Sequence, residues 1–339
     1  MRAIVLGMLL TTHTVWAAGF DPALEAAARK EGSVAWYTGL IVNQAARPLA
    51  SAFEARFPGI EVRYARASNT ETTLKLLNES RAGRVAADVF DITSGIHTLI
   101  DAHVVAAYKP NSAAGFAPEH KDKDGYWTAS NLYFMTLCYN TNLIAAADAP
   151  REFADLAAPR WAGKIAWTSE LAITGPPGFV GNVLTAMGNE AGTAWLRRLA
   201  ALHPAAMPIS PRAVMDQVIA GEYAIGLMTY NHHAAISAAA GAPVGWTKLE
   251  PLIGLFSSMG VLKDAPHPNA ARLFVEYTMS EEGQGVLAAN DYLPASPAVA
   301  TRLAGLRPDT GGFRVNSLSA ETIRDELPKW TAVYREIFR

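Results

Sequence analysis

A small hydroxyl-rich turn at Thr93 and Ser94 is the first place in this chain where residue types and spacing could do chemistry. It follows residues 88–92, whose apolar side chains predict a buried strand because the run is too short for a helix. We expect a helix to start at Thr93 or Ser94, with a hydroxyl accepting one of its unpaired N–H bonds. Ligands of open parallel sheets bind outside the carboxyl ends of strands. An ordinary strand-to-helix turn has the same pattern, so repetition of the pattern is what favours a binding site.

Two further strand ends carry the same kind of residue. Gly39 follows a strand expected at residues 34–38, and Ser68 and Asn69 follow one expected at 61–67. Helices expected at 42–57 and 69–80 separate the three strands, and this alternation predicts right-handed βαβ units with a parallel sheet. The three strand ends then share one edge. The S-x-x-E pattern that begins at Ser68 predicts a capping box at the start of a helix.

The second half of the chain offers similar positions. Thr174 precedes a Gly-Pro-Pro-Gly run that predicts a helix start, and Ser210-Pro211-Arg212 predicts another, with Ser210 as the cap. Tyr230 and Asn231 follow a strand expected at 223–229. Helix N-termini present N–H donors and partial positive charge, and a guanidinium can fork onto a carboxylate or phosphate.

These positions together predict a site for a small anionic organic solute that bears a carboxylate, phosphate or phosphonate. The predicted ligand-binding residues are Gly39, Ser68, Asn69, Thr93, Ser94, Thr174, Arg212, Tyr230 and Asn231.

The adjacent residues His232 and His233 raise the question of a metal. On a strand or an extended loop, neighbouring side chains point to opposite faces, so we expect that the two rings do not share one ion. The single cysteine, Cys138, excludes a cysteine-based metal cluster and an internal disulfide. We therefore predict no metal and no cofactor. The alternative is a metal site built from Tyr139, Tyr230 and His232.

Composition and motifs exclude several classes of function. Half of the 339 residues are apolar, 18% are charged and the net charge is −2, which is typical of a globular chain. A Lys/Arg-rich stripe is missing, so nucleic acid is not an expected partner. The sequence contains no G-x-S-x-G, H-E-x-x-H, G-x-x-x-x-G-K-[ST] or G-x-G-x-x-G motif. An exported enzyme stays an alternative function, and a binding protein is the favoured one.

The first residues have the form of an export signal. Arg2 forms a short positive region, residues 3–10 are apolar, and Val15 and Ala17 give a small-x-small cleavage pattern. We expect the mature chain to start at Ala18 in the periplasm. The apolar run is too short to span a membrane, and no later run reaches the length of a transmembrane helix.

Four stretches carry a resemblance to a known family. They are residues 86–92 (AADVFDI), 159–165 (PRWAGKI), 218–230 (VIAGEYAIGLMTY) and 267–284 (HPNAARLFVEYTMSEEGQ). They resemble the extracellular solute-binding proteins of ABC importers, in the ferric-binding-protein-like group. The resemblance implies an α/β, two-lobed periplasmic-binding-protein fold whose two crossover strands act as a hinge. It also implies a small-molecule solute, a monomer, and a permease and ATPase as partners.

The expected division follows from two apolar crossover runs at residues 133–139 and 252–262. A signal peptide covers 1–17. Lobe 1 comprises 18–132 plus 252–300, and lobe 2 comprises 133–251 plus 301–339.

Ferric members of the resembled group bind iron through a histidine, a glutamate and two adjacent tyrosines. Carried over, the histidine falls at Ile41, the glutamate at Thr93 or Ser94, and the tyrosine pair at Asn231-His232 or His232-His233. None of the four ligands is preserved. Binding of ferric iron or another metal ion is therefore the alternative function, and an organic anion is the predicted one.

The export signal gives a direct test. Protein recovered from the periplasm should begin at Ala18, because signal peptidase cuts after the small residue Ala17. N-terminal sequencing of the exported protein measures this, and material that still carries Met1 would contradict it.

Overall fold

The structure is a computed structural model that describes residues 19–303 and 305–338. The expected signal peptide and its cleavage position lie outside the described residues. No helix in the described part of the chain is long and apolar enough to cross a membrane.

The first part of the chain alternates strands and helices, as the sequence predicts. Its elements are α1 (Pro22–Glu31), β1 (Ser33–Thr38), a π-helical turn (Val42–Ala46), α2 (Arg47–Arg56), β2 (Glu61–Arg66), α3 (Asn69–Arg81), β3 (Val89–Ile92), α4 (Ile96–Asp101) and β4 (Val105–Ala106). Gly32 ends α1 in the left-handed conformation, with φ 74°, which a residue with a Cβ adopts only with strain.

The middle of the chain forms a second α/β unit after one long strand. Its elements are β5 (Thr128–Asn140), α5 (Phe153–Leu156), β6 (Ile165–Thr168), α6 (Pro176–Met187), α7 (Asn189–Ala200), β7 (Ala205–Met207), α8 (Pro211–Ala220), β8 (Ile225–Tyr230), α9 (Asn231–Ala239) and β9 (Val244–Thr247).

The last part returns to the first unit and then crosses again. Its elements are β10 (Leu252–Leu262), α10 (Pro268–Met279), α11 (Glu281–Ala289), β11 (Leu293–Pro294), α12 (Pro308–Gly311), β12 (Val315–Ser317) and α13 (Ala320–Ile337).

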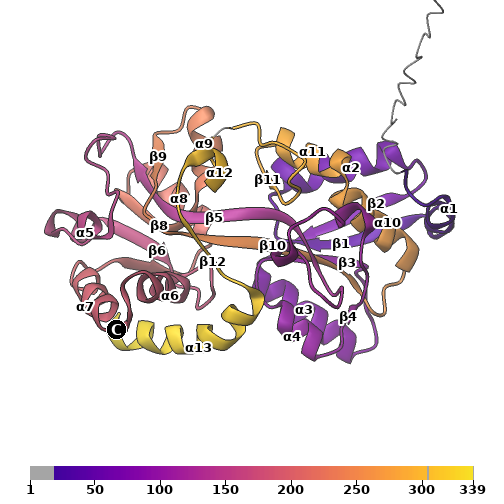
Figure 1. The fold of residues 1–339 in the computed structure, drawn as a ribbon, viewed down its shortest axis with the longest axis horizontal. Coiled ribbons are helices and arrows are strands. Elements are labelled where there is room, and N and C mark those ends of the chain that lie inside the picture. The colour runs from indigo at the N-terminus through magenta and orange to yellow at the C-terminus, as the bar shows by residue number, and fades with distance from the viewer. Residues whose placement is uncertain (1–18, 304, 339) are drawn as a thin grey trace, which may run out of the picture.

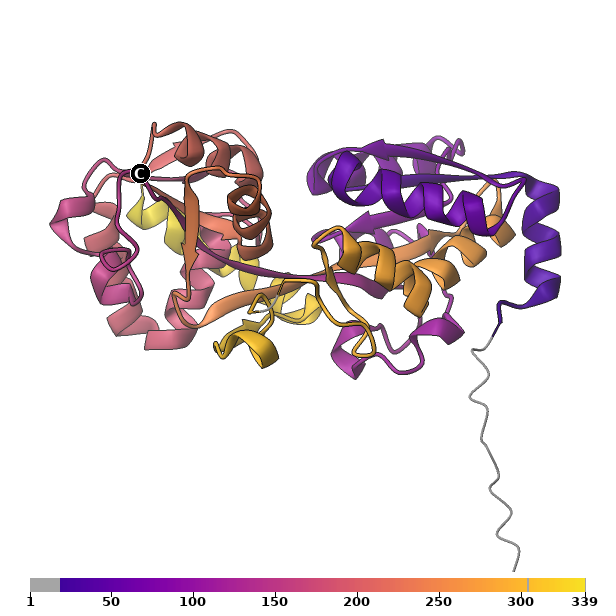
Figure 2. The ribbon, with the colours of Figure 1, turned by 90° about the horizontal axis from the view of Figure 1, so that it is seen from above.

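Two lobes are joined by β5 and β10, which run through the middle of the molecule (Figure 1). The sheet order is β2-β1-β3-β10-β5-β8-β6-β7, with β4 and β12 on β10 and β9 and β11 on β5. We call the part that contains β1 to β4 the first lobe and the part that contains β6 to β9 the second lobe. Figure 2 shows them on either side of the two long strands. The fold is the predicted two-lobed α/β fold with two crossover strands.

Each lobe contains its own group of contacting aromatic side chains within one continuous hydrophobic core. In the first lobe, Phe53 on α2 contacts Phe274 on α10 at a ring-centroid distance of 5.1 Å. In the second, Trp195 on α7 lies 5.2 Å from Phe153 of α5. Aromatic pairs of this kind contribute roughly 0.5–1.5 kcal/mol beyond the apolar area they bury.

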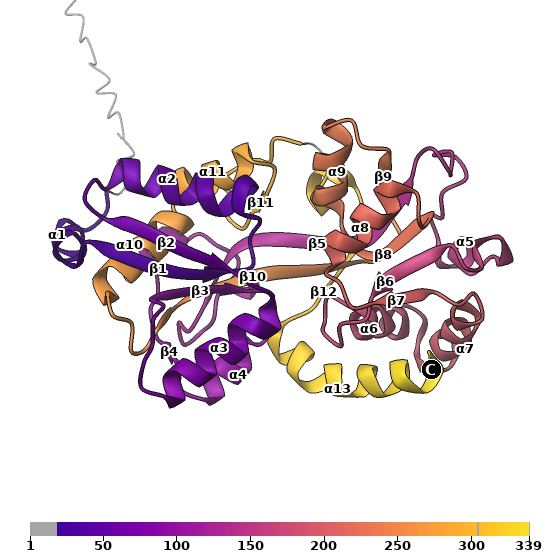
Figure 3. The same cartoon turned by 180° about the vertical axis from the view of Figure 1, so that it is seen from behind.

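The expected division at residues 132/133, 251/252 and 300/301 stays a prediction, and the packing supports it. Helices α10 and α11 pack on α1, α2 and β1 of the first lobe. Helix α13 packs mainly on α6 of the second lobe and touches α4 of the first. Figure 3 shows α13 along one edge of the molecule, beside α7 and leading back toward α3 and α4.

A buried carboxylate holds the strands together where they leave the first lobe. Asp91 on β3 is fully buried, and it accepts hydrogen bonds from Ser130 Oγ on β5 at 2.6 Å and from Ser257 Oγ on β10. Ser130 is the extra residue at a bulge, because Asn131 pairs with Ser257 and Ala129 pairs with Ser258. Burial raises the pKa of Asp91 to about 6, and the two hydroxyls oppose that shift.

Replacing Asp91 tests the energetic role of this group. Its folded pKa lies above the unfolded value, so the stability it contributes is complete below about pH 4 and is lost as pH rises through about 6. Asp91→Asn cannot ionise, and between pH 4 and pH 7 its free energy of unfolding should rise relative to wild type by roughly 3 kcal/mol. Denaturant titrations across that range measure the difference.

The exposed Asp264 supplies the matched control. Asp264→Asn makes the same chemical change without burial and should follow wild type at every pH. An Asp91→Asn curve that runs parallel to wild type would show that the buried carboxylate carries no such cost.

Candidate functional site

The three strand ends of the first lobe lie together, as predicted. Strand β1 pairs in parallel with both β2 and β3, so the residues after Thr38, Arg66 and Ile92 share one edge. The Asn69 Oδ1 atom accepts a hydrogen bond from the Thr93 N–H at 2.9 Å. The Gly39 N–H donates to the Asp91 carbonyl. The structure therefore brings Gly39, Asn69 and Thr93 together, but the Gly39 and Thr93 N–H groups and the Asn69 Oδ1 atom are bonded within the lobe.

One of these helix starts differs from the expectation and another agrees with it. Helix α4 begins at Ile96 with Gly95 as its cap, and no side chain caps it, so the prediction of a start at Thr93 or Ser94 is wrong. The reason is Gly95, whose φ of 93° inserts a left-handed residue before the helix. The predicted capping box at Ser68 is confirmed, which means that Ser68 Oγ is bonded to Glu71 N–H.

The open helix start of the first lobe lies after Gly39. Residues Val42–Ala46 form a π-helical turn that continues into α2, and no side chain caps it. The first N–H groups of such a segment have no partner within it. The turn lines a cavity of about 400 Å³ together with Arg66 and with Arg212 of the second lobe. This cavity lies between the lobes.

Arginine side chains approach this cavity from both lobes. Arg66 ends β2, and within the described residues its guanidinium has no hydrogen-bond or ion-pair partner. Arg212 lies in the first turn of α8, where the predicted Ser210 cap is confirmed. The Arg212 Nε atom lies 3.1 Å from the Asp216 carboxylate, and the Arg212 side chain is 30% exposed. An anion in the cavity would have a cation on each side.

Two predicted residues of the second lobe have a different role. Helix α6 begins at Pro176 after Gly175, and because Pro176 and Pro177 lack N–H groups, this end offers few donors. The expectation that a helix start near Thr174 supplies N–H donors is therefore wrong, and Thr174 itself is buried. Asn231 is also fully buried, and its Nδ2 donates to the Leu306 carbonyl at 2.9 Å. That amide ties α9 to the chain before α12.

The histidine pair lies on a helix, so the prediction of an extended segment is wrong. His232 and His233 occupy the first turn of α9, which has no side-chain cap. Their ring centroids are 4.2 Å apart, and the two residues are 0% and 5% exposed. None of their four ring nitrogens has a hydrogen-bond partner among the described residues. Buried polar atoms of this kind need a partner, so the pair points to a ligand.

The electrostatics of the pair follow from burial beside arginine. Burial, with a smaller effect of the Arg212 charge, lowers the pKa of His232 to about 3. Burial also holds the pKa of His233 well below its ordinary value, with contributions from His232, Arg212 and Arg66. Both rings are therefore neutral at physiological pH, and each offers one donor and one acceptor.

Three tyrosines surround the histidine pair. Tyr133 on the hinge strand β5 lies 4.9 Å from Tyr230 and 5.6 Å from His232, measured between ring centroids. Tyr292 of the first lobe lies 5.2 Å from His232, and its hydroxyl accepts from the Ile41 N–H. Burial raises the pKa of all three phenols, that of Tyr292 to about 12. The phenols are therefore protonated.

The alternative metal site with Tyr139 is not formed. Met135, not Tyr139, pairs with Tyr230 across β5 and β8, and four further residues along a strand span roughly 13 Å. Tyr139 instead packs against Gly245. Among the described residues there is no group of three or more His, Cys, Asp and Glu side chains that could hold a metal.

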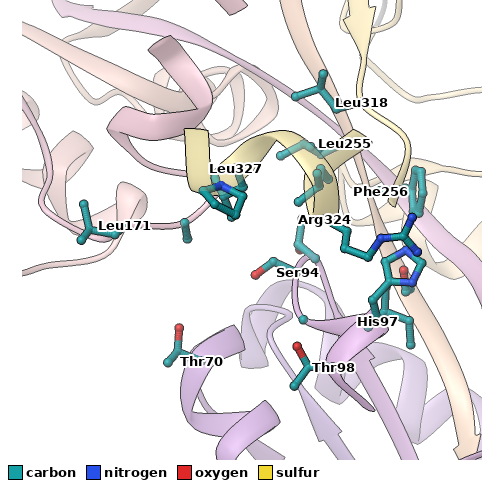
Figure 4. A pocket seen from close by; sticks show the side chains of 17 residues that line it. Thr70, Ser94, His97, Thr98, Leu171, Leu255, Phe256, Leu318, Arg324 and Leu327 are labelled. Carbon is teal, nitrogen blue, oxygen red and sulfur yellow. The ribbon is translucent and has the colours of Figure 1, made fainter. Parts of the chain in front are cut away.

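A second cavity extends the space between the lobes toward α13. It has a volume of about 340 Å³, and it is lined by Thr70, Thr93 and Ser94 of the first lobe and by Leu171 and Ala172 of the second. Figure 4 shows Leu171 across an open space from Thr70 and Ser94. The predicted residues Thr93 and Ser94 thus line this second cavity, whereas Arg66 and Arg212 line the first.

A bulge in β8 sets the direction of the histidine helix. Thr136 pairs with Thr229 and Leu137 with Leu227, which leaves Met228 as the extra residue. Met228 has a φ of 57°, a conformation that costs an L-residue roughly 1–2 kcal/mol. Bulges of this kind re-aim the side chains that follow them, and here they are Tyr230 and the first turn of α9.

Sequence reasoning missed three residues of this site, Arg66, Tyr133 and Tyr292, and it placed His232 and His233 on an extended segment. Arg66 lies at the end of the strand expected at 61–67, next to the predicted site residues Ser68 and Asn69, and could have been found. Tyr133 was assigned only to a crossover run. Tyr292 has no local motif, and the His232 and His233 environment depends on a strand ending one residue later than expected.

A family model described as bacterial extracellular solute-binding protein matches residues 87–308, which is more than half of the chain. The chain belongs to this family. Its family and fold are therefore those of solute-binding proteins and not of enzymes.

The similar proteins differ in what their names say they bind. An Fe(3+)-binding periplasmic protein of Serratia marcescens is 26% identical over 245 residues, which cover 69% of this chain and 70% of that protein. Iron-bound HitA from Pseudomonas aeruginosa has a TM-score of 0.71 at 22% identity and covers 90% of this chain and 99% of its own. The periplasmic binding protein AfuA from Actinobacillus pleuropneumoniae, with fructose-6-phosphate bound, has a TM-score of 0.76 at 17% identity, covering 91% and 98%.

Removing a buried histidine should change how stability depends on pH. Unfolded histidine takes up a proton below about pH 6.5, whereas buried His232 stays neutral to about pH 3. Wild type should therefore lose roughly 2 kcal/mol relative to His232→Phe between pH 6.5 and pH 5. Denaturant midpoints at several pH values measure this loss. The exposed His203 provides the control through His203→Asn, and equal slopes for His232→Phe and wild type would count against a buried neutral ring.

Proposed function

We propose that the protein is the periplasmic substrate-binding component of an ABC transporter and captures a small organic anion between its lobes. The observation that carries the proposal is the cavity lined by Arg66 from one lobe and Arg212 from the other. A carboxylate or phosph(on)ate there would receive charge-assisted hydrogen bonds from both sides. Such a ligand favours the closed arrangement because it bonds to both lobes at once.

The helix starts around the cavity support an anion. The uncapped π-helical turn lines the cavity from the first lobe, and the first turn of α8, which carries Arg212, lines it from the second. Helix N-termini attract anions through their free N–H groups and their dipole. The unpartnered nitrogens of His232 and His233 are buried near Arg66 and Arg212, whose charges contribute to the lowered pKa of His233. The partners implied by the family are a membrane permease and its ATPase.

Ferric iron is the second candidate function, because three phenols and two imidazoles converge in the structure. Iron(III) needs anionic oxygen ligands to offset its charge, and the histidine, glutamate and tyrosine pair that bind it in ferric members are not preserved at the carried-over positions. Arg66 and Arg212 would also repel a bare cation. The charges around the site therefore favour an anion over the iron named for several relatives.

A thermal-shift screen over organic acids, phosphonates, sugar phosphates, neutral sugars, amines and ferric citrate tests the proposal. A ligand at a hundredfold excess over its Kd should stabilise the folded protein by about 2.7 kcal/mol. We expect acids or phosph(on)ates to raise the midpoint. The Arg66→Gln, Arg212→Gln double variant should weaken the hit at least tenfold, because each lost charged hydrogen bond is worth roughly 1.5–3 kcal/mol.

The matched control is Arg63→Gln, on the same strand as Arg66 but exposed and paired with Glu61. It should bind as wild type does. Stabilisation by cations or neutral sugars alone would overturn the anion assignment. A coloured one-to-one ferric complex in the screen would establish the iron alternative instead.

A further inference from the structure

The second cavity differs from the first in its charge. Among the described residues that line it, Arg324 of α13 is the one arginine or lysine, and the Arg324 Nε atom lies 2.8 Å from the Asp325 carboxylate. Hydroxyl side chains, small residues, one histidine and apolar side chains form the rest of the lining. The anionic group of a solute is therefore better placed in the first cavity, beside Arg66 and Arg212. The second cavity suits an uncharged part of a ligand.

One wall of the second cavity is an apolar surface that the protein leaves uncovered. Leu171 of the second lobe is 41% exposed, and in the described part of the chain it is one of three large apolar side chains that are exposed. Ile323 and Leu327 of α13 line the same cavity and are only partly buried. Figure 4 shows Leu171 and Leu327 bordering one open space. Removing such a surface from water by covering it with an apolar ligand is favourable.

The two cavities lie beside each other along the strand-end edge of the first lobe. Arg66 lines the first and Thr70 the second, and four residues of chain span at most about 14 Å. Asn69 lies between them, because its Oδ1 atom accepts the Thr93 N–H at 2.9 Å and would lie 3.7 Å from a Cβ placed on Gly39. Thr93 lines the second cavity, and Gly39 precedes the turn that lines the first. A small molecule bound at Arg66 can therefore extend into the second cavity.

We propose that the solute is an organic anion with an aliphatic body, whose anionic group binds Arg66 and Arg212 while its carbon chain lies in the second cavity against Leu171. The inference rests on the proposed function and narrows its ligand class. Because residues of both lobes line the second cavity, the carbon chain joins the lobes a second time. Its burial adds affinity in proportion to the apolar area that leaves water.

A body that carries hydroxyl groups on every side fits this lining less well. Thr70, Thr93 and Ser94 could hydrogen-bond to such a body from the first lobe. The hydroxyl groups that face Leu171 and Leu327 would be buried without partners, which is unfavourable. An aliphatic chain satisfies the apolar wall and tolerates a hydroxyl only on its first-lobe side.

A series of alkylphosphonates tests this inference by calorimetric titration. Methyl-, propyl- and hexylphosphonate share the anionic group and differ in the length of the carbon chain. Each fully buried CH₂ group should strengthen binding about fourfold, so wild type should bind hexylphosphonate about tenfold or more tightly than methylphosphonate. Leu171→Asn keeps a side chain of similar size without the apolar contact, and it should lower this ratio of affinities about threefold or more.

Leu143→Asn is the matched control. Leu143 follows β5, is exposed and lines neither cavity, so this variant should keep the wild-type ratio. Both leucines are exposed, and the ligand-free variants should therefore unfold at the same thermal midpoint as wild type.

The outcomes separate this inference from the proposed function. Equal affinity for all three phosphonates, or a preference for the longer chain that survives Leu171→Asn, overturns the aliphatic body while the anion site stands. If Leu171→Asn weakens methylphosphonate as much as hexylphosphonate, Leu171 acts by packing against the protein when the lobes close, and the inference is wrong. If no phosphonate binds and other organic acids are also inert, the anion site fails and the inference with it.

Discussion

The buried carboxylate of Asp91 is the constraint on which the geometry of both lobes depends. It lies where β3, β5 and β10 meet, and an ionisable group in such a place must be satisfied by hydrogen bonds. Ser130 and Ser257 provide them, and Gln284 Nε2 binds the Ser130 carbonyl. The bulge in β5 is thereby fixed in place. These hydrogen bonds hold β5 and β10 in place at Ser130 and Ser257. Bending of the two hinge strands is therefore expected beyond these residues, toward the second lobe.

The space between the lobes is electrically divided. Arg66, Arg212 and an uncapped helix start line one cavity, and the buried rings of His232, His233, Tyr230 and Tyr292 lie in contact with one another. The histidines stay neutral because they are buried beside cations, and the phenols stay neutral because burial disfavours the phenolate. A ligand in this cavity therefore lies against the charged side chains of Arg66 and Arg212, and the rings of His232 and Tyr292 nearby are uncharged. This arrangement suits recognition of a polar small molecule without covalent chemistry.

Local rules predicted what local interactions decide. The parallel strand ends, the Ser68 capping box and the Ser210 cap follow from short-range patterns, and the structure has them. The helix start near Thr174 lacks the expected donors because its first two residues, Pro176 and Pro177, have no backbone N–H group. The contact between His232 and Tyr292 joins residues distant in sequence, and burial beside Arg66 depends on closure of the fold. A single sequence contains no signal for such long-range contacts.

The bulge at Met228 has a consequence for how this site can change. Side chains on a strand alternate between faces, so adding or removing one residue reverses the direction of everything that follows. Without the extra residue in β8, Tyr230 and the first turn of α9 would turn away from the space between the lobes. Substitutions can retune the pocket one side chain at a time. A single-residue deletion in β8 would remove the second lobe's half of it in one step.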